Sequence, residues 1–162
     1  MSVMSVSQIA FEIASASIAP NSDFIFDQVN MDPDHSGMLR YAILMGARIH
    51  ILDQRWEKGI PISKLRIQPA KKLNAVTVRP DHLSTLIQDL PALAMMAVCA
   101  DGTTVIRGVN DETPHLDALC QVLRKGGAQI EYNEGSLSIP GMNQQGQTLA
   151  KAIYSRFKEV SS

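Results

Sequence analysis

The sequence predicts an α/β (α+β) fold made of two tandem copies of one helix-and-strand unit, with a further helix near the C terminus. Residues 7–18 and residues 90–100 are both small and apolar nearly all round, which is the pattern of buried helices. The same order of elements follows each of them: a strand, an amphipathic helix and a return strand. The period is about 80 residues, longer than that of the usual solenoid repeats, which favours a duplicated unit over an open array.

The first copy begins its sheet with residues 24–29, whose aromatic and β-branched side chains predict a strand. Residues 32–37 form a polar turn with helix-start chemistry, and residues 38–45 follow as a helix that Gly46 closes. The alternation in residues 48–52 then predicts the return strand, and Trp56, after a polar run, is expected in a loop.

The second copy repeats this order. Asp101-Gly102 turns the chain before a strand over residues 103–107, and residues 115–125 have the period of an amphipathic helix. The remaining elements are a cap at Gly126-Gly127, a return strand over residues 128–132, a hairpin turn at residues 133–136 and its second strand at residues 137–139.

The two copies are expected to form one domain over residues 1–141, with units of about 1–78 and 79–141. Short strands over residues 64–67 and 75–78 fall between the two copies. Residues 142–162 form a polar linker and an amphipathic helix, whose apolar stripe consists of Leu149, Ile153, Phe157 and Val160.

Composition excludes several classes of protein. With 45% apolar and 19% charged residues the chain is an ordinary globular one, and its net charge of -1 lacks the basic footprint of a nucleic-acid binder. No apolar run is long enough for a bilayer, and the first residues do not resemble a signal peptide. Cys99 and Cys120 lie in apolar helical patterns and are predicted to be buried, reduced thiols. Together these features indicate a cytoplasmic protein with neither a nucleic-acid nor a membrane partner.

The usual motifs of metal and phosphate sites are absent from the sequence. The histidines lack metal-ligand spacing and are expected at the surface or at caps, so no metal site is predicted; they are His35, His50, His82 and His115. Gly126-Gly127 follows a helix instead of opening one, so it is not a phosphate cradle.

Several segments, taken in order, are similar to the EPSP synthase family. Residues 89–94 (Asp-Leu-Pro-Ala-Leu-Ala) resemble the family's Asp-Glu-x-Pro-x-Leu-Ala helix start, and residues 101–107 contain its Gly-Thr-Thr-x-Ile-Arg pattern. Residues 123–128 resemble Leu-Arg-x-x-Gly-Ala. In the first copy, residues 32–37 resemble Asn-Pro-Thr-Arg-x-Gly and residues 45–47 match Met-Gly-Ala. The match covers most of residues 7–140, with the motifs in order and at similar spacing.

The resemblance implies a fold of two domains, each with three βαβαββ units around pseudo-threefold symmetry. This chain resembles two such units of the C-terminal enolpyruvyl transferase domain, in agreement with the duplication. It also implies the family's activity in the shikimate pathway, the transfer of the enolpyruvyl group of phosphoenolpyruvate to the hydroxyl of shikimate 3-phosphate through a tetrahedral intermediate. No cofactor is expected. Two highly charged anions require many Lys and Arg donors, together with a carboxylate that moves protons.

Asp89 matches the family aspartate that holds the substrate hydroxyl and is often assigned as the base. A carboxylate at a helix N terminus accepts backbone N–H groups and stays ionised, which suits that role. The residues alone favour another interpretation, a plain N-terminal cap before Pro91, and the resemblance leaves both interpretations open.

The segment before the second amphipathic helix departs from the family. Glu112 matches the family glutamate, assigned by the resemblance to catalysis, but Asp111 stands where the family has a lysine and His115 where it has an arginine. An aspartate reverses a charge meant for an anionic substrate, and a histidine cannot reproduce the bidentate phosphate clamp of an arginine, so substrate binding at both positions is in question. Capping of a helix by Asp111 or Thr113 explains the same residues.

Two functions therefore stay open. The chain is a partial or diverged EPSP synthase, predicted to be inactive alone, which handles phosphoenolpyruvate and shikimate 3-phosphate only with the missing domain. Alternatively, it is a non-catalytic binding or assembly module that kept the fold. In both cases the missing third unit should leave an apolar face, which we expect the C-terminal helix or a homodimer partner to cover.

Overall fold

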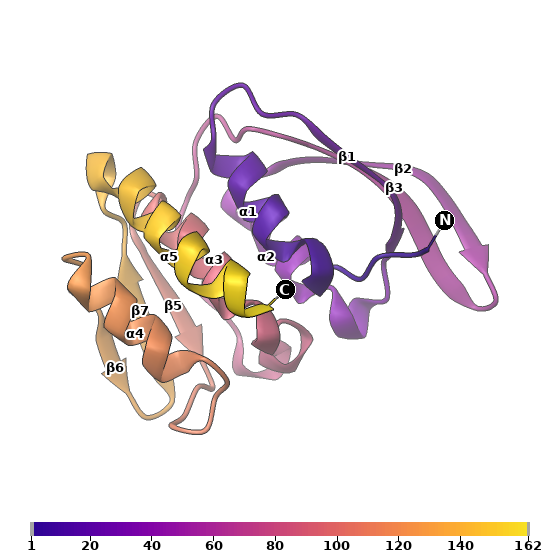
Figure 1. Ribbon diagram of the computed structural model, residues 1–162. Helices are drawn as coiled ribbons and strands as arrows, with labels where there is room; N and C mark the ends of the chain where they lie inside the picture. The colour runs from indigo at the N-terminus through magenta and orange to yellow at the C-terminus, as the bar shows by residue number, and fades with distance from the viewer. Residues whose placement is uncertain (1, 162) are drawn as a thin grey trace.

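The computed structural model describes residues 2–161, with side chains up to Lys158, and within this range the strands form two sheets (Figure 1). The first sheet has the order β1-β3-β2 and is antiparallel, with β1 (Phe24–Asn30), β2 (Arg48–Glu57) and β3 (Ile60–Gln68). The second has the order β4-β5-β7-β6, with β4 (Thr77–Val78), β5 (Thr103–Arg107), β6 (Glu131–Asn133) and β7 (Ser136–Pro140). In the second sheet β4 and β5 are parallel and the other pairs are antiparallel.

The helices are α1 (Ala10–Ile18), α2 (Gly37–Met45), α3 (Leu90–Val98), α4 (Leu116–Lys125) and α5 (Gly146–Ser161). Short 3-10 turns precede several of them: η1 (Ser7–Ile9), η2 (Pro33–His35), η3 (Pro80–Thr85), η4 (Ile87–Asp89) and η5 (Asn143–Gln145). The predicted order is thus confirmed, because α1, β1, α2, β2 and β3 are followed by α3, β5, α4, β6 and β7.

Each copy also opens with a short parallel contact to its sheet. Met4 forms an isolated parallel bridge with Val29 of β1, just as β4 pairs in parallel with β5. With these openings both copies have the βαβαββ order, which confirms the predicted fold class. β4 lies on the first-unit side of the predicted boundary between residues 78 and 79, although its hydrogen bonds are to the second sheet.

The centre of the molecule is made by α1 and α3. Every residue of α3 is buried, and on α1 the small residues Ala10, Ala14 and Ala16 are buried together with Ile13. Small side chains let the two helices approach closely, while their apolar surface excludes water on all sides. Along β5 and β7 buried and more exposed residues alternate, so one face of the second sheet is buried, and α3 and α4 lie on that face (Figure 1).

The C-terminal helix α5 lies across the apolar surface of α3 and runs antiparallel to α1. Near its start, Gln147 Nε2 donates a hydrogen bond of 2.6 Å to the carbonyl of Ile18, at the end of α1. Near its end, Lys158 Nζ lies 2.6 Å from Glu12 Oε1, in the first turn of α1. Its buried side chains are Leu149, Ala150, Ile153 and Phe157, so α5 covers an apolar face as expected. The side chain of Val160, the fourth member of the predicted stripe, lies outside the described residues.

One expectation about the first sheet is wrong. Trp56 lies in strand β2 and not in a loop, and 73% of its surface is exposed. The strand continues because β2 and β3 form a hairpin whose turn residues, Lys58 (φ 52°) and Gly59 (φ 79°), both have positive φ. Such a turn matches the twist of the flanking strands, but Lys-Gly is a weaker signal than Asn-Gly or Asp-Gly.

Both cysteines are free thiols. Cys120 is buried as predicted and Cys99 is half-buried, and burial raises the pKa of Cys99 to about 11. Neither is an activated nucleophile, since activation requires a lowered thiol pKa. Among the helices of residues 2–161, none combines the length and the apolar character that a membrane span requires.

Candidate functional site

Asp89 ends the η4 turn and occupies the N-cap position of α3, where only 3% of its surface is exposed. Its side chain does not hydrogen-bond to the backbone of α3, so the expected acceptance of backbone N–H groups is wrong and the plain-cap interpretation loses its main support. Instead Oδ2 accepts a hydrogen bond of 3.1 Å from the hydroxyl of Ser7, at the start of η1. The N-terminal ends of α1 and α3 therefore meet at this carboxylate.

The environment of Asp89 raises its pKa from 3.8 to about 6. Burial is the main cause, because it disfavours the charged form, and the hydrogen bond from Ser7 partly opposes it. No lysine or arginine of the described residues contributes to the shift. A carboxyl with this pKa is mostly ionised at neutral pH yet accepts and releases protons readily, as a general base or acid requires.

Replacing Asp89 by asparagine is expected to stabilise the chain at neutral pH. Because the pKa is raised in the folded state, this group's contribution to stability is complete below pH 3.8 and is lost as the pH rises through 6. A shift of about two units corresponds to up to about 3 kcal/mol at pH 7.5, and the gain should vanish near pH 4. Urea unfolding of Asp89→Asn at both pH values measures it, with the exposed Asp34→Asn as control. A variant less stable than the parent at pH 7.5 contradicts this account.

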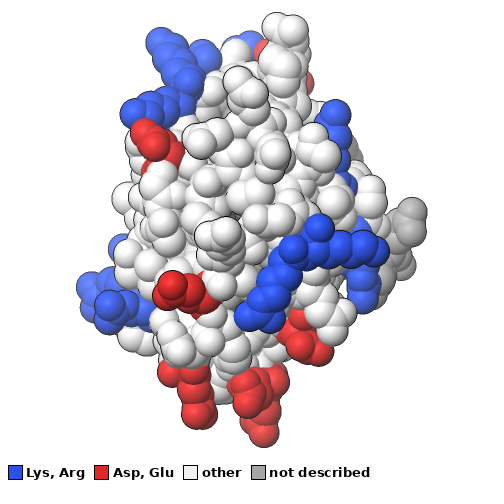
Figure 2. All heavy atoms as spheres, turned by 90° about the vertical axis from the view of Figure 1, so that its left-hand side faces the viewer, with Lys and Arg blue, Asp and Glu red and all other residues white. Residues whose placement is uncertain are grey.

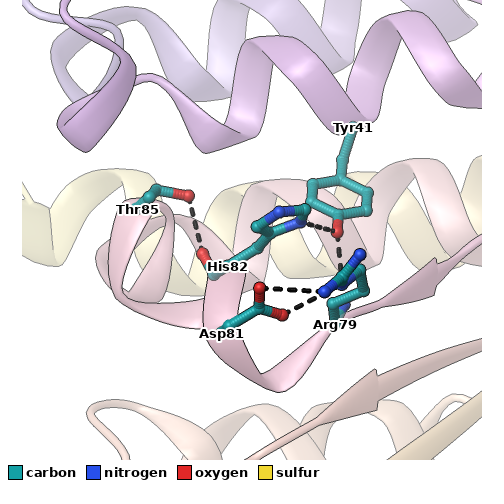
Figure 3. A network of polar contacts seen from close by, with 5 residues as sticks. All are labelled: Tyr41, Arg79, Asp81, His82 and Thr85. Atoms are coloured by element: carbon teal, nitrogen blue, oxygen red, sulfur yellow. Dashed lines mark hydrogen bonds and ion pairs between the residues drawn. The ribbon is translucent and has the colours of Figure 1, made fainter.

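The segment that leads to Asp89 is held against α2 by a polar network (Figure 3). The hydroxyl of Tyr41, a buried residue of α2, lies 2.6 Å from His82 Nδ1 and accepts a hydrogen bond of 3.2 Å from the backbone N–H of Arg79. Arg79 also pairs with Asp81, and the hydroxyl of Thr85 donates to the carbonyl of His82 at 2.6 Å. Together these contacts fix the turn η3, from which the chain continues to η4 and Asp89.

The loop before α4 contains the other predicted site residues, and most of its hydrogen bonds are local. Glu112 is exposed and donates its backbone N–H to Asn110 Oδ1 at 2.8 Å. Thr113 accepts from the backbone N–H of Asn110 at 2.9 Å, while Asp111 accepts from the hydroxyl of Tyr132, on β6, at 2.6 Å. The bond to Asp111 is the main cause that raises the pKa of Tyr132 to about 12. The side chains of Asp111 and Thr113 thus stabilise the loop and not the helix.

His115 occupies the N-cap position of α4 in a left-handed conformation, with φ of 64° and no side-chain cap. Its ring packs edge-on against Phe157 of α5, with 6.0 Å between the ring centres. Within the described residues, Asp89 has its side-chain hydrogen bond with Ser7 and none with Asp111, Glu112 or His115. The structure therefore does not bring the four predicted residues into one cluster, and no group of three or more metal-ligating side chains gathers among the described residues.

These residues nevertheless belong to one end of the molecule. In Figure 1 the helices α1, α3 and α4 each have their N-terminal end toward the lower right, the direction in which α5 ends. On the face that carries α4, acidic side chains lie at the bottom of the view with Lys and Arg side chains above them on both sides, while the middle is largely uncharged (Figure 2). Three helix N termini favour anions, whereas acidic side chains repel them, so binding of an anion here requires further cations.

Two residues at this end escaped the sequence analysis. Ser7 was treated only as part of a buried helix, and no local pattern signals its bond to Asp89 because the two are 82 residues apart. Arg107 ends β5 just before the loop and is exposed, and its guanidinium makes no ion pair with any other described residue. Arg107 is the last residue of the Gly-Thr-Thr-x-Ile-Arg pattern, and this position in the pattern was the sequence signal that could have identified it.

Comparisons with known proteins agree on one family. The model of the family EPSP synthase (3-phosphoshikimate 1-carboxyvinyltransferase) matches residues 6–154. The 3-phosphoshikimate 1-carboxyvinyltransferase of Synechococcus sp. (strain JA-3-3Ab) is 37% identical over 141 residues, covering 84% of this chain and 31% of that protein. The one from Alkaliphilus oremlandii (strain OhILAs) is 34% identical over 140 residues, covering 84% and 33%.

Solved structures show the same relationship. EPSP synthase from Acinetobacter baumannii matches with a TM-score of 0.79 and 25% identity, covering 86% of this chain and 32% of that one. The enolpyruvyl transferase NikO from Streptomyces tendae shares the fold, with a TM-score of 0.59 at 15% identity over 91% of this chain and 36% of that one. The chain spans about a third of the length of the curated relatives it matches. From residue 6 to residue 154, this chain belongs to the EPSP synthase family.

Proposed function

We propose that this chain forms one part of an enolpyruvyl transferase of the shikimate pathway and that it is inactive without the rest. In this proposal Asp89 accepts the proton of the shikimate 3-phosphate hydroxyl while the hydroxyl oxygen bonds to C2 of phosphoenolpyruvate and C3 gains a proton from a general acid, which gives the tetrahedral intermediate. The C2–O bond to phosphate then breaks, phosphate leaves, and C3 loses a proton so that the enolpyruvyl double bond forms again. The raised pKa of Asp89 and its place where two helix N termini meet support the role of base.

The observation that carries the proposed inactivity is the lack of cations around Asp89. No described lysine or arginine influences its pKa, Arg79 is paired with Asp81, and Lys158 is paired with Glu12. Two multiply charged anions cannot be held next to a carboxylate without compensating positive charge. We propose that the missing part of the enzyme supplies most of it, with Arg107 as this chain's own contribution. A cytoplasmic location is part of the same proposal.

Asp111 and His115 favour the second candidate, a non-catalytic binding or assembly module. Asp111 accepts a hydrogen bond from Tyr132, and His115 packs on Phe157. Each residue therefore has a structural role in this chain that does not depend on binding a substrate. In this case the fold would be kept for assembly with a larger polypeptide or a second copy, and the transfer reaction would be lost.

Phosphate release and calorimetry separate these possibilities. The isolated chain, mixed with phosphoenolpyruvate and shikimate 3-phosphate, should release no phosphate above the uncatalysed level. When the chain replaces the matching third of a full-length relative, we expect weak turnover that rises at least about 100-fold in the variant Asp111→Lys/His115→Arg, because two phosphate contacts are restored.

Asp89→Asn in the same chimera is the decisive control, since it should abolish turnover while binding measured by calorimetry persists. Turnover by the isolated chain refutes the proposed inactivity. A chimera that binds both substrates and works equally well after Asp89 is replaced by asparagine refutes the proposed role of Asp89.

A further inference from the structure

The bond between Ser7 and Asp89 is one of the polar contacts that join the two units of the fold. Ser7 is exposed at the start of η1, whereas Asp89 is buried, so the serine is the outer member of the pair. Its hydroxyl donates to Oδ2 at 3.1 Å across 82 residues of sequence. Helix α1 follows Ser7 directly, and helix α3 follows Asp89.

We propose that Ser7 is a positioning residue, which holds the Asp89 carboxylate in the orientation used for proton transfer and keeps it from capping α3. This inference rests on the proposed function, in which Asp89 is the base.

The geometry supports this assignment because Asp89 has a competing partner close by. An aspartate at an N-cap position ordinarily turns its carboxylate onto the first backbone N–H groups of its helix. Asp89 does not. The N2 residue of its helix is Pro91, which has no N–H, so the backbone N–H of Ala92 at N3 is the donor that a cap would use. The hydroxyl of Ser7 is the side-chain donor that the described residues provide to it. Without this donor we expect the carboxylate either to rotate onto the backbone of α3 or to remain neutral at higher pH.

A second feature concerns the way in which a substrate hydroxyl would reach Asp89 in this proposal. A serine hydroxyl has one proton and two lone pairs, and the proton of Ser7 is directed at Asp89. The lone pairs stay available on the exposed side of the pair. A substrate hydroxyl that approaches the nearly covered carboxylate therefore meets Ser7 first, which suits a residue that orients both groups.

The test is the titration of Asp89 in the full chain, followed by carboxyl carbon NMR. Relative to the parent, Ser7→Ala should shift the titration midpoint of Asp89 by about one pH unit, upward if the carboxylate loses its donor and downward if it turns to cap α3. Ser7→Thr, which keeps the hydroxyl, should restore the parent midpoint. The matched control is Ser5→Ala, because the Ser5 hydroxyl accepts from the backbone N–H of Gln8 at 3.1 Å and does not contact Asp89.

An unchanged midpoint in Ser7→Ala, or an equal shift in Ser5→Ala, overturns the inference. In an active chimera, Ser7→Ala should also lower kcat more than it raises KM and move the acidic limb of the pH–rate profile in the same direction as the midpoint. If the midpoint shifts but Asp89→Asn leaves turnover intact, the proposed function fails while the bond between Ser7 and Asp89 stands. If Asp89 proves essential and Ser7→Ala changes neither the midpoint nor kcat, only the positioning role fails.

Discussion

Deletion of residues 143–162 should leave a chain that aggregates or associates instead of folding as the parent does. These residues include η5 and α5, which packs against α3 and α4 and buries the side chains of Leu149, Ile153 and Phe157. Burying side chains of this size is worth about 1.5–3 kcal/mol each, so the deletion removes about 4.5–9 kcal/mol. That is comparable with the entire stability of a typical domain, about 5–15 kcal/mol.

The deletion also removes the hydrogen bond from Gln147 to Ile18 and the ion pair of Lys158 with Glu12, which connect α5 to α1. Without Lys158, the carboxylate of Glu12 loses its ion pair, and its second oxygen, Oε2, is already buried without a hydrogen bond. Size-exclusion chromatography with light scattering, together with thermal melting, measures the outcome. The full-length variant Lys151→Ala, which changes an exposed position of α5, should behave like the parent. A truncated chain that stays monomeric with the parent's melting temperature would show that α5 is dispensable for the core.

Replacing Gly141 by alanine should be the most damaging single-methyl change in the connection to α5. A Cβ atom at this position would lie 1.8 Å from the carbonyl oxygen of Ala100, and a backbone atom cannot move aside as a flexible side chain can. The clash falls where the chain is held on both sides, because Gly141 donates to the carbonyl of Gly102 at 2.9 Å and Met142 to that of Val98 at 2.8 Å. We expect a loss of about 3 kcal/mol or more, equivalent to a melting temperature about 10 °C lower.

Gly135→Ala is the matched control for this prediction. Gly135 has a φ of 103°, which is unfavourable for alanine, but a Cβ atom there would meet nothing within 4 Å. The control should therefore lose only about 1–2 kcal/mol from backbone strain. If Gly135→Ala proves the more damaging of the two in urea unfolding, backbone conformation and not close approach governs this region.

Much of the fold could be predicted from the sequence because the signals concerned are local. The all-round apolar character of residues 90–100 indicates a buried helix whatever it packs against, and Gly46 does close α2, with φ of 114°. The hairpin of β2 and β3 was underestimated because the Lys58-Gly59 turn has a weak local signature. Trp56 was expected in a loop because it follows the polar residues 53–55.

The contacts of the candidate site residues could not be predicted from local sequence patterns. The resemblance of residues 89–94 to the family pattern pointed to Asp89, and the same resemblance revealed that Asp111 and His115 stand where the family has cations. The partners of these residues could not be foreseen, since Ser7, Tyr132 and Phe157 lie 82, 21 and 42 positions away in the chain. The raised pKa of Asp89 likewise depends on burial, which is a property of the packed molecule.

By itself, then, the sequence determined the order of the elements and the duplication, because apolar periodicity and turn chemistry act over a few residues at a time. The family was indicated separately, by the resemblance of short motifs that occur in the family's order. Only the tertiary structure decided that α5 runs antiparallel to α1, that Ser7 and not the backbone of α3 binds Asp89, and that β4 pairs with β5. These outcomes depend on which apolar faces meet, and that choice is made by the packing of the whole chain, in which distant segments compete for the same partners.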